Sequence, residues 1–385
     1  GRLMRIFIIA GEVSGDKLGG ALMAGLRSQV AELSFDGVGG PKMREQGLRS
    51  LFAMDELSLM GIVEILPKYF HLKRRIRELT EAILANPPDV LITIDSPDFC
   101  LRVAAAVKER NPEIRTVHYV APTVWAWRPE RAERMAKFID HVLSLFPFEP
   151  PYMEKAGMEC DFVGHPVVAE KIGTEEEAIS LRTVLGMKNG PLVLALPGSR
   201  RSEVSRLAGT FGSALSKLQD NHPDMRVIVP CAAPVAGLVR KLTAHWPVRP
   251  VLVDPTRESG FSGAKLAAFR AADVALAASG TVSLELAASG TPMVIAYDMN
   301  WLSRRIIKKK LLIDTVTLVN LVSDTRTIPE FIGSECRPGA IAEALEQVLQ
   351  NPEAQKEAMR LTMERLGQGG EPPGLRAAKA VLARL

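Results

Sequence analysis

Two successive blocks of short, continuous apolar runs, separated by segments of helical periodicity, restrict the fold of this chain more than any other feature. Continuous apolar strands joined by helices are typical of a parallel sheet that is covered on both faces. In the first block, the predicted strands are residues 5–10, 35–38, 90–94, 116–120, 141–145 and 161–163. In the second block, they are residues 192–196, 226–230, 251–253, 274–277 and 293–296. We therefore expect an α/β protein with two doubly wound, Rossmann-like parallel sheets.

The strand and helix pattern weakens between residues 164 and 190, and we place the boundary between two domains there. We expect an N-terminal domain of residues 4–170 and a second domain of residues 171–350. Residues 351–385 are predicted to form C-terminal helices that cross back to the first domain. Two doubly wound domains facing a cleft are a common arrangement for binding a nucleotide and a second substrate.

The composition excludes several classes of protein. Apolar residues make up 47% of the chain and charged residues 24%, as in ordinary soluble proteins. The net charge of +4 is too small to favour nucleic acid as a partner. The four cysteines and six histidines show no metal-binding spacing, so we predict neither a metal nor a cofactor. No apolar run approaches the roughly 20 residues that span a bilayer, and we expect a cytoplasmic protein.

Two glycine-bearing turns follow predicted strands of the second block. One has the sequence PGSR and ends at Arg200, and the other has the sequence ASGT at residues 278–281. Glycine lets an anion approach the backbone closely, and helix N-termini and arginine bind phosphate. Glu285, about one turn further on, suits ribose hydroxyls, although a helix-capping carboxylate is the alternative. The predicted nucleotide-binding residues are Arg200, Ser279, Gly280, Thr281 and Glu285.

Carboxylates follow the strands of the first block. Glu12 and Asp16 flank Ser14 in the sequence GEVSGD, and Asp95 and Asp98 lie in IDSPDF. Open α/β sheets bind ligands at the carboxyl ends of their strands. The carboxylates of Glu12 and Asp16 suit sugar hydroxyls better than phosphate, and Asp98 is our candidate for the general base of a glycosyl transfer. Helix capping is the alternative throughout, and for Asp95 it explains the residue equally well.

Two further segments suggest contact with sugar or lipid. Trp125 and Trp127 follow the strand at residues 116–120, where their rings suit a sugar or an acyl chain, although one of them is expected in the core. Residues 57–77 join apolar and aromatic side chains to a basic run, as interfacial membrane contacts do, and a core helix with a basic end fits equally well. The predicted membrane contacts are Met60, Ile62, Val63, Ile65, Leu66, Phe70, Lys73, Arg74 and Arg75.

Eight motifs occur in the order found in one known family. They are GEVSGD, MGIVEIL, IDSPDF, HYVAPTVWAWR, FPFE with GHP, PGSRRSEV, ASGTVSLE and VNL at residues 319–321. Over nearly its whole length, the chain resembles the lipid-A-disaccharide synthase family of inverting glycosyltransferases.

This resemblance implies a GT-B fold with the active site in the cleft between two Rossmann-like halves. It implies transfer of 2,3-diacylglucosamine from UDP-2,3-diacylglucosamine to 2,3-diacylglucosamine 1-phosphate without a metal. The family's base falls on Asp98, its UDP-binding residues include Asn320 as well as those named above, and Glu12 and Ser14 match residues near the sugar. Family members are peripheral proteins of the inner membrane, and some are homodimers that exchange C-terminal elements.

Two other functions fit the same pattern of turns and strands. A UDP-sugar 2-epimerase would need no acceptor, and a non-catalytic nucleotide-sugar sensor would bind UDP without forming a product. The apolar and basic residues 59–75 favour a lipid substrate over both alternatives.

Overall fold

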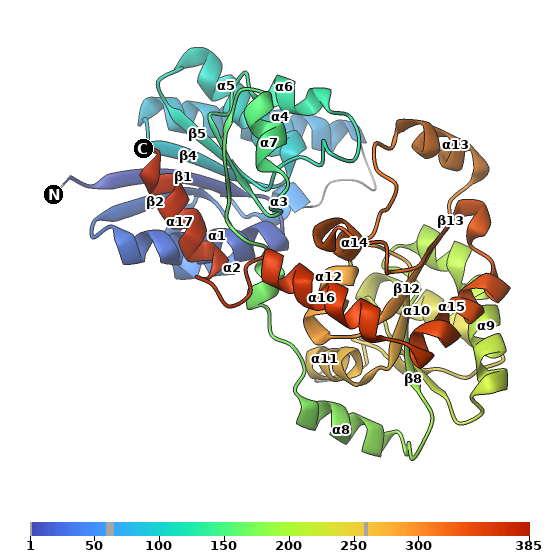
Figure 1. Cartoon of the computed structure of the whole chain (residues 1–385). Helices are drawn as coiled ribbons and strands as arrows, with labels where there is room; N and C mark the ends of the chain where they lie inside the picture. The colour runs from blue at the N-terminus through green and yellow to red at the C-terminus, as the bar shows by residue number, and fades with distance from the viewer. Residues whose placement is uncertain (1, 59–64, 258–260) are drawn as a thin grey trace. The chain divides into compact units, whose positions relative to one another are not determined.

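The computed structural model describes residues 2–58, 65–257 and 261–385. It divides the chain into two compact units (Figure 1): Gly1–Ala169 with Leu366–Leu385, and Glu170–Arg365. Each unit is built around one parallel sheet with helices on both faces, which confirms the predicted α/β class.

The first unit contains a parallel sheet with the strand order β3-β2-β1-β4-β5-β6-β7. Its strands are β1 (Met4–Ala10), β2 (Leu33–Val38), β3 (Leu48–Ser50), β4 (Val90–Ile94), β5 (Arg115–Tyr119), β6 (His141–Ser144) and β7 (Glu159–Phe162). The central strands β1 and β4 are mostly apolar, and Ile8, Ile9, Leu91 and Ile92 are completely buried. The order reverses between β1 and β4, so a ligand-binding crevice is expected at the carboxyl ends of these two strands.

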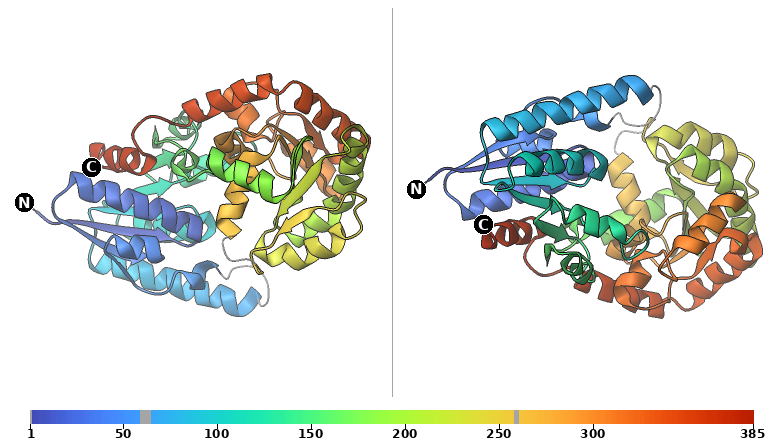
Figure 2. Two further views of the ribbon diagram at one scale, coloured as in Figure 1. Left: turned by 90° about the horizontal axis from the view of Figure 1, so that it is seen from below. Right: turned by 90° about the horizontal axis from the view of Figure 1, so that it is seen from above.

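Helices cover both faces of this sheet. They are α1 (Val13–Gln29), α2 (Pro41–Glu45), α3 (Asp55–Ser58), α4 (Ile65–Ala85), α5 (Pro97–Arg110), α6 (Glu130–Met135), α7 (Pro150–Lys155) and α17 (Pro373–Ala383), with a 3₁₀ turn at Pro166–Ala169. Although α17 is far away in the sequence, it lies beside α1 in Figures 1 and 2. The two helices approach closely because both carry glycine: a Cβ on Gly25 would lie 2.7 Å from the Gly374 carbonyl oxygen.

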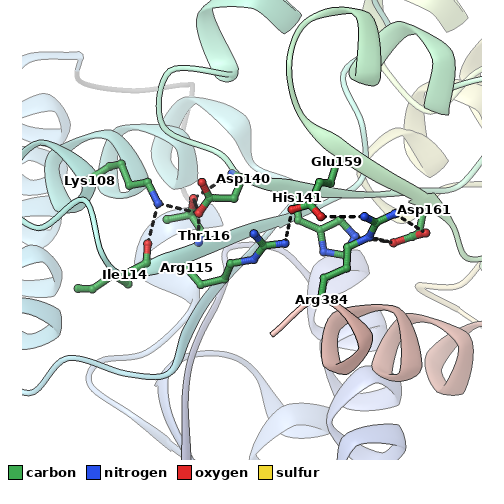
Figure 3. A network of polar contacts seen from close by, with 9 residues as sticks. All are labelled: Lys108, Ile114, Arg115, Thr116, Asp140, His141, Glu159, Asp161 and Arg384. Atoms are coloured by element: carbon green, nitrogen blue, oxygen red, sulfur yellow. Dashed lines mark hydrogen bonds and ion pairs between the residues drawn. The ribbon is translucent and has the colours of Figure 1, made fainter.

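A chain of ion pairs fastens Arg384, just after α17, to the sheet (Figure 3). Its guanidinium donates to Glu159 over 2.7 Å and to Asp161 over 2.7 Å, both on β7. Glu159 also accepts from Arg115 on β5 over 2.6 Å, and Asp161 lies 2.7 Å from Nε2 of the buried His141 on β6. Residues from β5, β6, β7 and the C-terminal segment thus form one polar cluster.

The second unit contains a parallel sheet with the order β10-β9-β8-β11-β12-β13. Its strands are β8 (Leu192–Leu196), β9 (Arg226–Pro230), β10 (Val251–Val253), β11 (Val274–Ala277), β12 (Met293–Tyr297) and β13 (Glu330–Ile332). Its α-helices are α8 (Glu175–Val184), α9 (Arg201–Asn221), α10 (Ala236–Thr243), α11 (Phe261–Ala271), α12 (Ser283–Ser289), α13 (Trp301–Lys310), α14 (Leu318–Ser323), α15 (Pro338–Gln350) and α16 (Glu353–Arg365). The order reverses between β8 and β11, so a second ligand-binding crevice is expected at their carboxyl ends.

The C-terminal segment of residues 351–385 is shared between the units. Helix α16 packs against α12 and α14 in the second unit, where the buried Gln355 exchanges hydrogen bonds with the backbone of Met293. Helix α17 belongs to the first unit by its contacts with α1. The assignment of acceptor and donor binding to the two units stays a prediction.

Candidate active site

The predicted carboxylates of the first unit lie where its strand order reverses. Glu12 follows β1, and Asp95, Ser96 and Asp98 follow β4, which pairs with β1 as far as Ala10 and Ile94. The Ser96 hydroxyl donates to Glu12 Oε1 over 3.5 Å, so the two loops meet. The side chains of Glu12 and Asp98 are exposed, as is that of Ser14 in the first turn of α1. The structure thus brings Glu12, Ser14 and Asp98 to one edge of the sheet.

Backbone strain is concentrated at the same edge. Asp95, Ser96, Val120 and Arg128 have φ angles of 48°, 40°, 84° and 51°, and Asp324 is the only other non-glycine residue with positive φ in the described part of the chain. Such a conformation costs on the order of 1–3 kcal/mol for each residue and occurs mainly at functional sites. All four residues lie in the loops that follow the neighbouring strands β4 and β5, which supports a binding site there.

The environment of Asp95 also sets it apart. Partial burial and the nearby charge of Glu12 raise the pKa of the Asp95 carboxyl, against the effect of a hydrogen bond from the Ser96 backbone. A carboxyl whose pKa is raised in a crevice is a candidate for proton transfer. Asp95 therefore joins Asp98 as a possible acid–base group of this edge.

Asp16 has a structural position instead. Its carboxylate is buried, with 3% of the residue exposed, and accepts hydrogen bonds from three backbone N–H groups at the start of α2. Those groups belong to Gly40, Lys42 and Met43, and the oxygen–nitrogen distances are 2.9, 3.0 and 3.0 Å. The contacts use both carboxylate oxygens, so Asp16 holds α2 beside α1 rather than facing a ligand.

The two predicted tryptophans differ in burial. Trp125 is buried, packs edge-on against Phe146 and Phe148, and donates from Nε1 to Glu149 over 3.1 Å. It is the core residue of the pair. Trp127 is half-buried, and the Arg128 guanidinium lies 4.5 Å from the centre of its ring. Trp127 is therefore the one whose ring remains partly open to a ligand.

In the second unit, both glycine-bearing turns lie at the carboxyl ends of paired strands. Leu196 of β8 is opposite Ala277 of β11, and the turns follow directly. In the PGSR turn, Glu203 Oε1 accepts from the backbone N–H groups of Ser199 and Arg200, at 3.4 and 3.2 Å. These two amides, which we expected to face phosphate, are occupied in this state. The exposed guanidinium of Arg200 makes no ion pair with the described residues.

The ASGT turn packs tightly against the loop that contains Val316, and it carries two hydroxyl side chains. A Cβ on Gly280 would lie 2.2 Å from the Val316 carbonyl oxygen, so only glycine fits. The hydroxyls of Ser279 and Thr281 lie 2.7 Å apart, and the Thr281 N–H donates to Ser279 Oγ over 3.2 Å. Glu285 has a half-exposed side chain 3.7 Å from Lys265 Nζ. The turn and the helix that follows it therefore bring two hydroxyls and a carboxylate to the carboxyl end of β11.

Asn320 supports this turn from within the fold. It is buried, its amide donates to Thr315 Oγ1 and to the Ile328 carbonyl over 3.2 and 3.0 Å, and its Oδ1 accepts from the Ile328 N–H. Glu330 also supports the loop behind the turn, and the sequence did not predict it. Its Oε1 accepts from the N–H groups of Val316 and Thr317. No motif indicates Glu330, because its role depends on a fold contact with a distant segment.

The predicted membrane contacts are only partly described. Met60, Ile62 and Val63 lie outside the described residues, as do the side chains of Ile65 and Leu66 in α4. The Phe70 side chain is 65% exposed and Lys73 and Arg74 are also at the surface. The Arg75 side chain is only 19% exposed and pairs with Glu56 and Glu78, so it belongs to the packing of α4.

Two other kinds of site are absent from the part of the chain that the structure describes. Within residues 2–58, 65–257 and 261–385, no group of three or more histidine, cysteine, aspartate or glutamate side chains could hold a metal ion. In the same described ranges, no helix combines the length and apolar character needed to cross a membrane.

Solved structures with a similar fold include proteins named as UDP-N-acetylglucosamine 2-epimerases. A putative UDP-N-acetylglucosamine 2-epimerase from Listeria monocytogenes has a TM-score of 0.62 and 13% identity, covering 99% of this chain and 95% of that one. The UDP-GlcNAc 2-epimerase from Neisseria meningitidis, solved with UDP-GlcNAc, has a TM-score of 0.60 and 12% identity, covering 99% of both chains. At these identities the likeness shows the fold alone, and that fold places the chain in the GT-B class.

The sequence comparisons identify the family within this class. The family model described as lipid-A-disaccharide synthetase matches residues 6–382. Lipid-A-disaccharide synthase from Ruegeria pomeroyi is 65% identical over 387 residues, covering 100% of this chain and 96% of that protein. The synthase from Rhodospirillum centenum is 44% identical, with coverages of 98% and 94%. The chain belongs to the lipid-A-disaccharide synthetase family and is a glycosyltransferase, as the motifs predicted; the epimerase alternative has only the distant similarity of fold in its favour.

Proposed function

We propose that the chain transfers 2,3-diacylglucosamine from UDP-2,3-diacylglucosamine to 2,3-diacylglucosamine 1-phosphate. The products are the β-1,6-linked disaccharide 1-phosphate and UDP. Membership of the family supports the reaction class. The observation that supports the assignment of residues is that each sheet reverses its strand order beside a different chemistry: carboxylates in the first unit, and glycine turns with hydroxyls and a guanidinium in the second.

In this proposal the second unit binds the UDP part of the donor. Arg200 and the hydroxyls of Ser279 and Thr281 meet the diphosphate, and Gly280 allows its close approach. Glu285 accepts hydrogen bonds from the ribose, and Asn320 keeps the supporting loop in place. As the bond to UDP breaks, negative charge grows on the leaving diphosphate, and the Arg200 guanidinium and the hydroxyls of the ASGT turn stabilise it without a metal.

The first unit binds the acceptor and activates it. The acceptor's 6-hydroxyl oxygen forms a bond to the anomeric carbon while the bond from that carbon to the diphosphate oxygen breaks, so the configuration inverts. The hydroxyl proton passes to the carboxylate of Asp98, which is exposed in the first turn of α5. Glu12, Ser14 and Trp127 contact the sugar. Asp95 is the second candidate for the base, because its carboxyl has the raised pKa.

We also propose that the protein attaches peripherally to the cytoplasmic face of the inner membrane through α4 and the residues before it. The exposed Tyr69 and Phe70 beside Lys73 and Arg74 support this contact, because aromatic rings and cations together favour a lipid surface. A homodimer stays a prediction, and light scattering of the purified protein tests it.

Mass spectrometry of the products tests the proposed reaction. The protein is incubated with both diacylated sugars in the presence of EDTA, and in parallel without the acceptor. We expect the disaccharide 1-phosphate and an equal amount of UDP only when both sugars are present. Release of UDP or a changed sugar without acceptor would instead indicate an epimerase, and UDP binding without any product would indicate a sensor.

A further inference from the structure

A groove that no part of the proposed reaction uses runs between α4 and α5 of the first unit. The two helices lie side by side in Figure 1, and the groove between them has a volume of about 420 Å³. Ile76 and Ala106 contribute apolar surface to it, and Thr80 lines it from α4. The Thr80 hydroxyl already donates to the Ile76 carbonyl over 2.7 Å, so the groove's free polar groups are its charged side chains.

Cationic side chains outnumber carboxylates in the groove. At one end Arg110 pairs with Glu81 at 2.5 Å, and Glu109 is close by. The three remaining cations, Lys73, Arg77 and Arg102, form no ion pair with any carboxylate of the described ranges. The lining therefore keeps an excess of two positive charges after all its carboxylates are counted.

These unpaired cations precede the Arg110–Glu81 pair along both helices. Lys73 and Arg77 are one turn apart on α4, and Arg102 lies in the second turn of α5. A hydrogen bond from Lys73, its charge, and the nearby charge of Arg102 lower the pKa of the Tyr69 hydroxyl, so the two helices direct positive charge to one place. The Lys73 ammonium also lies 4.8 Å from the centre of the Tyr69 ring.

The surroundings of this cationic end favour a lipid over a small soluble ion. The rings of Tyr69 and Phe70, at the same end of α4, are 42% and 65% exposed and lie edge to face with their centres 5.7 Å apart. Large exposed aromatic residues beside unpaired cations suit the boundary between headgroups and acyl chains.

We propose that the cationic end of the α4–α5 groove is a binding site for the phosphate of an anionic phospholipid headgroup. Lys73, Arg77 and Arg102 donate to the phosphate oxygens, and Tyr69 and Phe70 lie at the level of the acyl chains. The site adds a specific lipid contact to the proposed membrane attachment. It rests on that proposal, because the groove meets lipid only when the protein is attached to the membrane. It does not depend on the proposed reaction, because neither Arg77 nor Arg102 takes part in sugar transfer.

The test compares binding to vesicles of phosphatidylcholine alone and of phosphatidylcholine mixed with phosphatidylglycerol. The variant is Arg77→Gln with Arg102→Gln, and its control, Arg44→Gln with Lys217→Gln, removes the same charge from exposed positions on α2 and α9. We expect the groove variant to bind the mixed vesicles at least roughly tenfold more weakly, since each cation near a lipid surface contributes on the order of 1 kcal/mol. The control pair and an Arg77→Lys, Arg102→Lys variant should stay within about threefold of the parent protein.

Two further measurements separate this site from its alternatives. Turnover of both sugars in detergent should be the same for the groove variant and the parent protein, and mixed-vesicle binding should survive inorganic phosphate at matched ionic strength. Equal losses in the groove and control variants would overturn the proposal, as would an absence of preference for phosphatidylglycerol. Displacement of the protein from vesicles by inorganic phosphate would assign the groove to a soluble phosphate and would overturn the proposal. Lost turnover with intact vesicle binding would assign the groove to the sugar acceptor and would overturn it too.

Discussion

Arg384 donates from Nε to Oδ2 of Asp161 over 2.7 Å, although 223 residues separate them in the chain (Figure 3). The contact joins the segment after α17 to β7 and shares Asp161 with the buried His141. It closes the first unit with residues that follow the whole of the second unit in the sequence.

Replacing Arg384 by alanine should therefore lower the stability of the first unit. We expect the free energy of unfolding to fall by about 1–2 kcal/mol, because hydrogen bonds to two partly exposed carboxylates are lost. Chemical denaturation followed by circular dichroism measures the change. Arg360→Ala is the matched control, since among the described residues Arg360 pairs only with Glu357 and Glu364 on its own exposed helix surface, and its effect should be much smaller. Equal effects of the two substitutions would contradict a role of Arg384 in closing the unit.

Asp98→Asn should lower the turnover number by about 10²–10⁴-fold and leave the KM for the acceptor nearly unchanged, because the amide cannot take the proton. UDP release in the presence of both sugars measures the rate. Asp95→Asn is the comparison, since Asp95 lies three residues away and has the raised pKa. If Asp98→Asn kept the parent rate while Asp95→Asn lost it, the base would be Asp95.

Gly280→Ala should weaken UDP binding by roughly 10–100-fold, because the added Cβ would meet the Val316 carbonyl oxygen at 2.2 Å and displace the turn. Isothermal titration calorimetry with UDP measures the dissociation constant. Gly237→Ala on α10 makes the same chemical change where a Cβ would meet nothing within 4 Å, and it should leave binding unaltered. An unchanged affinity in Gly280→Ala would place the nucleotide away from this turn.

Asp16→Asn and Ser14→Ala should have different effects. The asparagine amide offers one acceptor oxygen where the carboxylate serves three N–H groups, and the free energy of unfolding should fall by about 1.5–3 kcal/mol. Ser14→Ala changes an exposed residue and should leave stability unaltered but raise the KM for the acceptor. Thermal unfolding and steady-state kinetics on both variants distinguish the two roles; a fully stable Asp16→Asn protein would show that the α2 contact is dispensable.

His118 should make the protein less stable in acid. Burial lowers the pKa of His118 to about 4, from an ordinary value of 6.5, and its Nδ1 lies 2.7 Å from the Thr93 hydroxyl. Because the folded pKa is depressed, the buried neutral imidazole has no effect on stability above pH 6.5, and the free energy of unfolding falls by a total of about 3 kcal/mol as the pH drops towards 4. Denaturation between these pH values should show a shallower loss for His118→Asn than for the parent protein. The exposed His245→Asn should keep the parent's pH dependence, and an unchanged slope in His118→Asn would refute the assignment.

The two sheets could be predicted because their central strands are almost continuous apolar runs, such as residues 90–94. Every residue of that strand is buried, so apolar and polar residues do not alternate along it. The edge strands β3 and β13 were not predicted, since Leu48–Ser50 and Glu330–Ile332 are three residues long and half-exposed, and neither carries a strand-like pattern.

The site was predictable in position more than in detail. The motifs placed Glu12, Asp98, Arg200 and Gly280 after strands, and strand order then brings them to the two reversal points. A sequence does not tell which way a side chain points. Asp16, Trp125 and Asn320 also stand in motifs of the family, yet their polar atoms bond within the fold. The partners of Asp16 and Trp125 lie at least 24 residues away in the chain, too far to be inferred from spacing.

The return of α17 to α1 has a consequence for synthesis on the ribosome. The residues of the second unit are contiguous, so this unit can fold as soon as it emerges. The first unit emerges earlier but must wait, with one face of α1 uncovered, until residues 366–385 have been translated. During that interval the nascent chain exposes apolar surface that chaperones recognise, and an interruption of translation after residue 365 would leave the first unit incomplete beside a finished second one.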